Sequence, residues 1–431
     1  MTENELTRRR YLQGAAGVGA TLAAAGCTGS SSGGGSTSTA TNELEVLHAW
    51  TGGDGKKAVE NLISVWKEEH PDIESNFKAI GGGANQNLKS VLNTRFSNDD
   101  PPSAFQDWPG KNFARYEGVL GDISSVWEGD GGFAETHIDR AAQICKQDGT
   151  YHAVPIGSHR LNCLFYNVSV VEEAGVDPDS LTSASKLLDA MDTVASETDK
   201  VPLAHGMKAP WTTLQLWAAV MLSVGGFDDY MTFVNEGGAK SSVTEAFEVT
   251  KTMLSDYIEE GAASTGFTGA NQMIMDGKAA FIHQGNWAAG AFRNKSDFAY
   301  DEDWGFKTFP GTEKMYTFHT DAFLYPSNNP SPQATKTWME FVGSKKAQVA
   351  FNKFKGSIPT RTDVSKDEFG PYLQETIDDF AQAKKYPPTL AHGLAVVPGK
   401  MSDLKGALTS DFTGPYKVES VTDKFVSTVK A

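Results

Sequence analysis

Alternating apolar and polar positions at the start of the folded part of the chain predict a strand, and an amphipathic helix follows it. In that helix Ala58, Leu62, Val65 and Trp66 share one face, and Pro71 comes just after its end. The strand-helix order repeats before a third strand, which favours a parallel sheet covered by helices. Ligands of such sheets lie beyond the carboxyl ends of the strands. The expected elements are strands at 44–50, 72–80 and 103–106 and helices at 56–69 and 84–96.

Two extended runs, Tyr151–Val154 and Leu161–Tyr166, occupy the middle of the chain, and we expect Pro155 to end the first. Two further breaks fall at Pro310-Gly311 and at Gly356–Pro359. The remaining pattern is mostly helical, including the C-terminal part apart from a loop at 387–399. Helices are expected at 183–195, 211–224, 243–260, 271–276 and 330–354, and strands at 279–283, 304–309 and 316–325.

The composition restricts the class of protein. The chain has 431 residues, more than one hydrophobic core usually holds and suitable for two large lobes. Apolar residues make up 39% and charged residues 21%, as in globular proteins. The net charge of −16 argues against a nucleic-acid partner and against binding anionic lipid through a basic surface.

Cysteine and histidine spacing gives no sign of a metal. The chain has no CxxC pair and no Cys/His cluster, so neither a zinc site nor a cofactor is expected. Cys145 and Cys163 flank the first of the extended runs. An exported protein could join them in a disulfide, with two buried thiols as the alternative, and the sequence leaves both open.

The N-terminus resembles an export signal and not part of the fold. Thr7–Gln13 has the twin-arginine pattern, and the apolar run Gly14–Ala25 is too short to span a bilayer. Small residues precede Cys27 as in the site that a lipoprotein signal peptidase cuts, so residues 1–27 are expected to be the signal, with the lipid on Cys27. Residues 28–42 form a flexible tether. We therefore expect an exported protein on the outer face of the cell membrane, attached through this lipid only.

Several segments carry a resemblance to a known family. They are LEVLHAWTGGDGKKAVENL, DPPSAFQDWPGK, YHAVPIGSHRLNCLFYN, GKAAFIHQGNWAAG, TDAFLYPS and FNKFKGSIPTRTDV. The chain resembles the extracellular solute-binding proteins of ABC transporters, in the group that includes the maltose-binding proteins. Its motifs at 48–54, 355–361 and 391–393 resemble those of the glucose-type monosaccharide binders. Two residues depart from that pattern, Ala49 in place of an aromatic residue and Asp54 one place early.

The resemblance implies an α/β fold of two lobes, the type II periplasmic-binding-protein fold, with three hinge crossings and the ligand in the interlobe cleft. The three breaks fall where such crossings would lie. We expect one lobe to comprise residues 43–154 and about 312–355, and the other about 156–310 and 359–431. Hinge bending around a ligand is the motion of periplasmic binding proteins in general.

A sugar site needs two kinds of side chain. Aromatic rings pack on the C–H face of a pyranose, and its hydroxyls require donors and acceptors. A tryptophan is more often core than ligand contact, and those within elements are expected in the core: Trp66, Trp217, Trp304 and Trp338, with Trp127 undecided. The expected ligand contacts are Trp50, Trp108, Trp211 and Trp287 with Asp107, Asp321, Lys355 and His392, and as second choices His48, Arg160 and Asn286.

Each polar candidate has a plainer interpretation. Asp321 could be a solvated loop carboxylate, although the family position favours an acceptor for hydroxyls. Lys355 could simply complement the dipole at a helix C-terminus. His392 could be structural, although its glycine-flanked loop is hard to explain by packing. Arg160 could contact sugar or brace the hinge, and the sequence does not decide.

The expected function is capture of a monosaccharide, a glucose-like hexose, for an ABC importer. The expected partners are the sugar and the permease subunits with their ATPase, and the protein is expected to be a monomer. Alternatives are a binder of a disaccharide, a polyol or glycerol phosphate. An exported glycoside hydrolase would need two carboxylates at a defined separation, and no GxSxG, HExxH or P-loop motif is present, so we expect no enzyme.

Overall fold

The computed structural model describes residues 43–82, 85–129 and 132–431. The expected twin-arginine motif, Cys27 and the tether at 28–42 lie outside these residues. Among the described helices, none combines the length and the apolar character that crossing a bilayer requires.

A five-stranded sheet organises the first lobe. Its strands are β1 (Leu44–His48), β2 (Ser75–Ala79), β3 (Ala104–Asp107), β6 (Ala153–Arg160) and β11 (Phe318–Leu324). They lie in the order β2-β1-β3-β11-β6. β1 is parallel to β2 and to β3, as the strand-helix pattern predicts, whereas β11 is antiparallel to both of its neighbours. The carboxyl ends of β1 and β3 therefore meet at one edge of the sheet, beside the middle of β11.

Helices cover this sheet and share its core. Trp66 and Trp338 are fully buried there, with ring centroids 5.2 Å apart, and each large side chain of this kind stabilises the fold by roughly 1.5–3 kcal/mol. Trp127, which the sequence leaves undecided, is also core and stacks on Tyr151. The helices are α2 (Gly53–Glu69), α3 (Gln86–Ser97), the 3₁₀-helix η2 (Gly110–Tyr116), α4 (Ser124–Trp127), α5 (Asp139–Ile144), α12 (Pro332–Val342) and α13 (Lys345–Lys355), with a small ribbon of β4 (Lys146–Gln147) and β5 (Thr150–Tyr151).

A four-stranded sheet organises the second lobe. Its strands, in spatial order, are β10 (Trp304–Thr308), β7 (Cys163–Asn167), β9 (Ala279–Gln284) and β8 (Val201–Ala204). Trp217 and Trp304 are fully buried in its cores, as expected. The flanking helices are α6 (Val168–Glu173), α7 (Ala184–Glu197), α8 (Pro210–Glu236), α9 (Lys240–Asp256), α10 (Phe267–Met275), α11 (Trp287–Arg293), α14 (Pro371–Gln382), α15 (Pro398–Ala407) and α16 (Val418–Lys430), with short 3₁₀ or π turns at η3 (Pro178–Ser180), η4 (Glu260–Ala263), η5 (Lys366–Glu368) and η6 (Leu408–Phe412).

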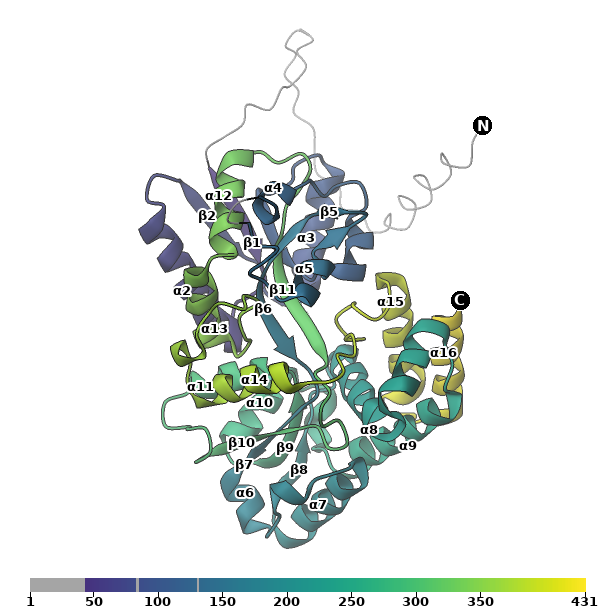
Figure 1. The fold of residues 1–431 in the computed structure, drawn as a ribbon. Helices are drawn as coiled ribbons and strands as arrows, with labels where there is room; N and C mark the ends of the chain where they lie inside the picture. Colours follow the sequence, from purple (N-terminus) through teal and green to yellow (C-terminus); the bar gives the residue numbers. More distant parts are fainter. Residues whose placement is uncertain (1–42, 83–84, 130–131) are drawn as a thin grey trace, which may run out of the picture. The chain divides into compact units, whose positions relative to one another are not determined.

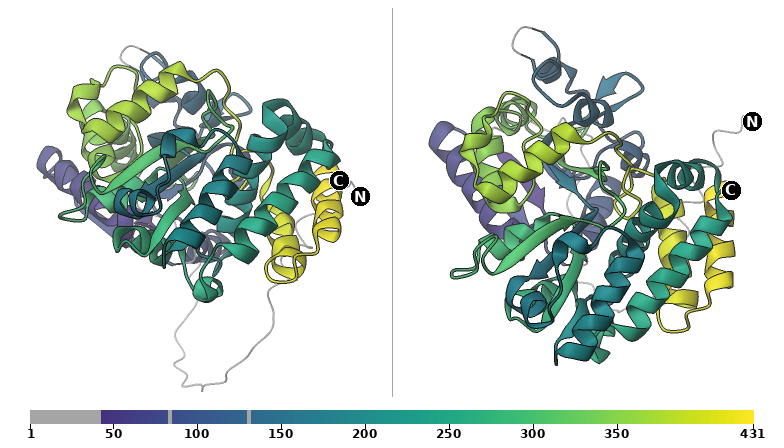
Figure 2. Two further views of the ribbon diagram at one scale, coloured as in Figure 1. Left: turned by 90° about the horizontal axis from the view of Figure 1, so that it is seen from below. Right: turned by 60° about the horizontal axis from the view of Figure 1, so that its bottom comes forward.

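The C-terminal helices close one side of the second lobe. Figure 2 shows α15 and α16 beside α8 and α9 in both views. Trp217 of α8 meets Phe425 of α16 with ring centroids 4.9 Å apart, and Phe247 of α9 packs against both. The end of the chain is thereby part of the core that carries the N-terminus of α8.

Most predicted helices shift by a few residues at their ends, and two differ more substantially from their predicted bounds. The helix expected at 211–224 continues to Glu236, because Gly226 adopts φ 72° and lets the chain kink and resume as a helix. The helix expected at 330–354 is two helices. Gly343 lies between them, at a position where a Cβ would come within 2.1 Å of Phe133, and Ser344 starts α13 by accepting a hydrogen bond from the Ala347 amide.

The prediction that Pro155 ends its strand is wrong. β6 runs through Pro155 to Arg160, because β6 is the edge strand and its pairing with β11 shifts register opposite this residue. The chain passes to the second sheet only after Arg160, and Figure 1 shows β6 and β11 running together between two groups of helices. It returns to the first sheet after β10 through residues 309–317.

The crossings between the sheets are tied together by hydrogen bonds. Asn162 donates to Thr312 Oγ1 (2.9 Å) and accepts from the Thr317 amide (2.9 Å). Ser158 and Ile358 exchange backbone hydrogen bonds of 2.8 and 2.9 Å, which places the segment after α13 against β6. Cys145 and Cys163 are free and buried, which selects the thiol alternative. Burial raises the pKa of the Cys163 thiol to about 12.

Candidate functional site

A cavity of about 320 Å³ lies between the two sheets. The first lobe contributes the turn after β1, the residues around the end of β3, part of β11 and the end of α13, whereas the second lobe contributes the N-termini of α8, α10 and α11. His159 of β6 and His392 of the loop before α15 complete it. The lining residues are Ala49, Trp50, Thr51, Gly52, Asp54, Gly82, Asn85, Gln106, Trp108, His159, Trp211, Phe267, Thr268, Trp287, His319, Asp321, Lys355 and His392.

The turn between β1 and α2 sets one wall. Gly53 adopts φ 54°, which lets the chain reverse into α2, and a Cβ at Gly55 would come within 2.6 Å of the Trp50 indole. Trp50 therefore packs closely against the start of the helix, and the centroid of its ring lies 4.9 Å from that of Phe351. At the same wall, Lys355 Nζ forms a buried ion pair and hydrogen bond with Asp54.

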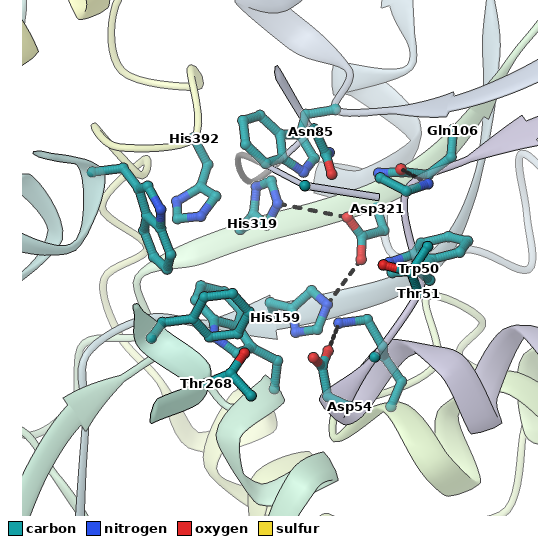
Figure 3. Close-up of a pocket in the computed structure, with 18 residues that line it drawn as sticks. Trp50, Thr51, Asp54, Asn85, Gln106, His159, Thr268, His319, Asp321 and His392 are labelled. Carbon is teal, nitrogen blue, oxygen red and sulfur yellow. Dashed lines mark hydrogen bonds and ion pairs between the residues drawn. The ribbon is translucent and has the colours of Figure 1, made fainter. Parts of the chain in front are cut away.

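Asp321 forms the polar centre of the cavity (Figure 3). Its Oδ2 accepts a hydrogen bond from His159 Nε2 (3.1 Å), and Asn286 Oδ1 lies 2.6 Å from the other ring nitrogen of His159. Because a carboxylate only accepts, His159 carries a proton on Nε2. The second oxygen of Asp321, Oδ1, lies 3.9 Å from His319 Nε2, which is too far for a hydrogen bond. This oxygen is available to a ligand hydroxyl.

The charge of Asp321 is stabilised despite its burial. Burial alone would raise the pKa of the carboxyl, but the hydrogen bond from His159 and the charges of His159 and Lys355 outweigh it and hold the pKa well below its usual range. His319, in contrast, is kept in its neutral form by burial. Burial lowers the pKa of His319 to about 3, with the Asp321 charge only partly offsetting it. The cavity thus presents an ionised acceptor beside a neutral imidazole.

Aromatic rings form the opposite side of the cavity. Trp211 and Trp287 belong to a small apolar cluster with Leu161, apart from the main cores, and their ring centroids lie 6.2 Å apart. His392 lies 4.8 Å from Trp108, 5.3 Å from Trp287 and 5.7 Å from Trp211. The Trp287 indole is fixed by its hydrogen bond to Gln284 Oε1 (3.0 Å). These rings offer apolar faces that are already positioned.

Buried histidines predict a loss of stability in mild acid. Burial is the main cause that lowers the pKa of His48, His137 and His283 to about 4 and of His205 and His319 to about 3. It also holds the pKa of His392 well below its usual value. In an unfolded chain the histidine pKa is about 6.5. Below that pH the unfolded chain therefore binds protons that the buried imidazoles of the folded chain do not bind.

The free energy of unfolding should therefore be highest above about pH 6.5 and fall as the pH is lowered toward 4, by up to about 1.4 kcal/mol per pH unit for each histidine. Urea unfolding at about pH 7, 6 and 5 measures it. Equal stability at the three values would contradict the neutral state of these imidazoles.

The structure brings together seven of the residues expected from the sequence. These are Trp50, Trp108, Trp211, Trp287, Asp321, Lys355 and His392. Lys355 satisfies both of its interpretations, because it is the last residue of α13 and also lines the cavity. Trp50 has two roles as well, since it packs in the first core and faces the cavity.

Four expected residues do not line the cavity. Asp107 turns away from it, where it accepts a hydrogen bond from Tyr116 (2.6 Å) and lies 3.3 Å from Lys89 Nζ. His48 is buried and stacks on Trp50 with ring centroids 5.9 Å apart.

Arg160 has its guanidinium bound to Asp379 and Thr308, with a further hydrogen bond to the Met315 carbonyl (3.1 Å). Arg160 thereby braces the crossing between the two sheets that follows β6. Asn286, another second choice, supports His159.

Sequence reasoning missed His319 and Gln106 and did not propose His159 as a contact. All three follow from strand alternation. His319 and Asp321 are two residues apart on β11 and share a face, as do Gln106 and Trp108 at the end of β3. His159 is paired with His319 across the sheet, which turns the neighbouring Arg160 to the opposite face. The alternation is visible in the sequence, but which of the two faces of each strand lines the cavity depends on the order of the strands in the sheet.

The arrangement suits binding of a neutral polar molecule. One side of the cavity carries the Asp321 carboxylate, the neutral imidazole of His319, the Gln106 amide and the Lys355 ammonium group, and aromatic rings form the other side. Among the described residues, no group of three or more His, Cys, Asp or Glu side chains could hold a metal ion.

Comparisons with known proteins agree with this architecture. The sequence model of the bacterial extracellular solute-binding proteins matches residues 66–387. The xylose/arabinose-binding protein XacG of Haloferax volcanii is 45% identical, with 99% of this chain and 98% of that protein covered. The uncharacterized ABC transporter extracellular-binding protein PH1214 of Pyrococcus horikoshii is 31% identical, covering 93% of this chain and 92% of that protein.

Among solved structures, one from work on xylan utilization by Caldanaerobius polysaccharolyticus aligns with a TM-score of 0.79 and 18% identity, covering 89% of this chain and 99% of that chain. The resemblance and the two-lobed α/β fold inferred from the sequence are thereby confirmed, whereas the glucose-type branch is not singled out. The chain belongs to the bacterial extracellular solute-binding proteins.

Proposed function

We propose that this protein binds a monosaccharide in the cavity between its lobes and delivers it to an ABC importer. The observation that carries the proposal is the pairing of the ionised Asp321 with preformed tryptophan faces across one cavity. Sugar hydroxyls donate to a carboxylate, and the C–H face of the ring packs on indole. The family consists of solute-binding proteins, which supports a binding function and no enzymatic activity.

The size of the cavity favours one sugar ring. At about 320 Å³ it lies at the lower end of the range of small-molecule pockets. Charge-assisted hydrogen bonds contribute about 1.5–3 kcal/mol each, and neutral ones about 0.5–1.5 kcal/mol. Several of these with one or two ring contacts suffice for micromolar affinity, about −8 kcal/mol.

Pentoses are the first candidates, because the relative with 45% identity is named for xylose and arabinose. A glucose-like hexose is the second, supported by the motifs around His48, Lys355 and His392. Xylose and glucose in their pyranose forms share the C2 to C4 hydroxyls, so both would present the same donors to Asp321. A thermal-shift screen of xylose, arabinose, glucose, maltose and glycerol phosphate tests the proposal. A thermal shift with maltose or glycerol phosphate alone would contradict the proposal, and so would the absence of a shift with every compound in the screen.

The lobes are proposed to close around the sugar. α11 of the second lobe lies directly against the first lobe, where Lys57 Nζ donates to the Asn294 carbonyl (3.1 Å) and Arg293 donates to the Lys353 carbonyl (2.8 Å). Gly290 permits this approach, because a Cβ there would come within 2.3 Å of the Lys355 carbonyl oxygen.

Gly290→Ala should therefore weaken sugar binding at least tenfold, since the backbone carbonyl cannot move away as a side chain could. Gly406→Ala is the matched control: this glycine also lies in a helix, and its Cβ would meet nothing within 4 Å. Calorimetric titration of both variants measures the effect. Equal affinities would show that the contact at α11 is not needed for binding.

Export and attachment are part of the proposal. The twin-arginine pattern and the small residues before Cys27 support a lipid-anchored protein on the outer face of the membrane, working as a monomer with a permease and its ATPase. The Pyrococcus relative, named for an ABC transporter, supports the partner. Mass spectrometry of the exported N-terminus tests the anchor, and an unmodified Cys27 on an uncleaved chain would refute it.

A further inference from the structure

A second and larger cavity, about 670 Å³, lies on the other side of the strand that carries Asp321. Phe318 lines this second cavity, whereas His319 and Asp321 line the sugar cavity, because successive side chains of β11 point to opposite faces. The loop after β3 and the loop before α15 also contribute residues to both cavities. Gly110 and Leu394 face the second cavity, and Trp108 and His392 face the first.

Positive charge surrounds this second cavity. Five cations line it, from η2, α5, β4 and the segment after α14: Lys111, Arg140, Lys146, Lys384 and Lys385. Lys146 has a distant carboxylate partner, Glu128 at 3.9 Å. The other four have no ion-pair partner among the residues that the structure describes. In a chain with a net charge of −16, such a group is the opposite of the average surface.

Apolar rings form the floor beneath these charges. The Arg140 guanidinium lies 4.5 Å from the Tyr386 ring, and Lys385 Nζ lies 4.6 Å from the Phe227 ring. Lys111 donates to the Ala395 carbonyl (2.6 Å), and burial with the nearby charge of Lys400 holds the pKa of Lys111 below its usual value. Like charges are therefore crowded here, and Glu128 beside Lys146 is their one ion-pair partner among the described residues, which raises their attraction for a ligand of the opposite sign.

We propose that this cavity is a second binding site, for a small anion that carries two or more carboxylate or phosphate groups. Its concave shape fits a small molecule, and the spread of the cations over four segments matches several charged groups on one ligand. Arg140 offers a planar fork for one carboxylate or phosphate, and the paired lysines Lys384 and Lys385 offer point charges for another.

Citrate and inorganic pyrophosphate are the probes that test this site. Each is titrated into the full-length protein by calorimetry, with the ionic strength held constant by sodium chloride so that screening does not change. The proposal predicts saturable binding of one anion per chain, weakened at least tenfold in the triple variant Arg140→Gln, Lys384→Gln, Lys385→Gln. The matched control is Lys67→Gln, Lys417→Gln, Lys430→Gln, which removes the same charge from exposed positions outside the cavity. The control should bind as the unchanged protein does.

The two cavities are distinguished by repeating the titration with saturating sugar. Anion binding that persists places the anion in the second cavity, whereas binding that sugar abolishes places it at Lys355 in the first and overturns the proposal. Equal, unsaturable binding by all three proteins also overturns it, because it would reflect net charge alone. Thermal unfolding of each variant checks that the fold is intact, and none of these outcomes depends on which sugar the first cavity binds.

Discussion

Asp321→Asn should weaken sugar binding by between about 10-fold and about 100-fold. The substitution keeps the size of the side chain but removes the charge, so at least one charge-assisted hydrogen bond to a sugar hydroxyl is lost, worth about 1.5–3 kcal/mol. His159 also loses the carboxylate that holds its ring, because its Nε2 donates to Asp321 Oδ2 at 3.1 Å. Calorimetric titration with the sugar found in the screen measures the change.

Asp411→Asn is the matched control for Asp321. Asp411 is also a buried, paired carboxylate, 2.7 Å from Lys424 Nζ and 2.6 Å from Ser420 Oγ, but it lies beside α16 and away from the cavity. Its replacement should lower stability while sugar affinity stays within about twofold, since no cavity residue contacts it. If Asp321→Asn and Asp411→Asn had the same affinity, the carboxylate would have no direct role in binding.

Trp211→Leu should weaken sugar binding about tenfold and change stability little. A ring contact contributes about 0.5–1.5 kcal/mol beyond the area it buries, and leucine cannot replace the flat indole face. Trp211 belongs to the small cluster at the cavity and not to the main core of the second lobe, so its loss removes few core contacts. Titration calorimetry and thermal unfolding of the same preparation separate the two effects.

Trp217→Leu provides the comparison within the same helix. Trp217 is fully buried and packs against Phe233, Phe247 and Phe425, so this change should cost about 3 kcal/mol or more of stability and leave the affinity of the folded protein unchanged. The opposite pattern, with affinity lost at Trp217 and retained at Trp211, would place the sugar away from the N-terminus of α8.

The sequence predicts the site best where a residue stands at the end of an element. Trp211 and Trp287 stand in the first turn of a helix and Trp50 lies in the turn before one, and all three line the cavity. Residues inside strands are harder, because the two faces of a strand are equivalent until its neighbours are known. The choice of Arg160 over His159, and of Asp107 over Gln106, is this one-residue ambiguity.

Prediction of the fold from the sequence has the same limit. The parallel pairing of β1 with β2 and β3 follows from local pattern, since the helices between them leave no other short connection. The continuation of β6 through Pro155 could not be predicted, because a proline is tolerated on an edge strand and the edge position arises only when β11 returns from residues 309–317. β8 was missed for a similar reason, since Pro202 lies in a short strand at the edge of the second sheet.

A crystal structure of the protein with the sugar that gives the largest thermal shift would show where the ligand lies and what Asp321 contacts. We expect one sugar ring in the cavity between the lobes, with a hydroxyl oxygen within about 3 Å of Asp321 Oδ1 and the ring against the Trp211 or Trp287 indole. A sugar bound outside this cavity, or one that leaves Asp321 without a hydroxyl partner, would contradict it.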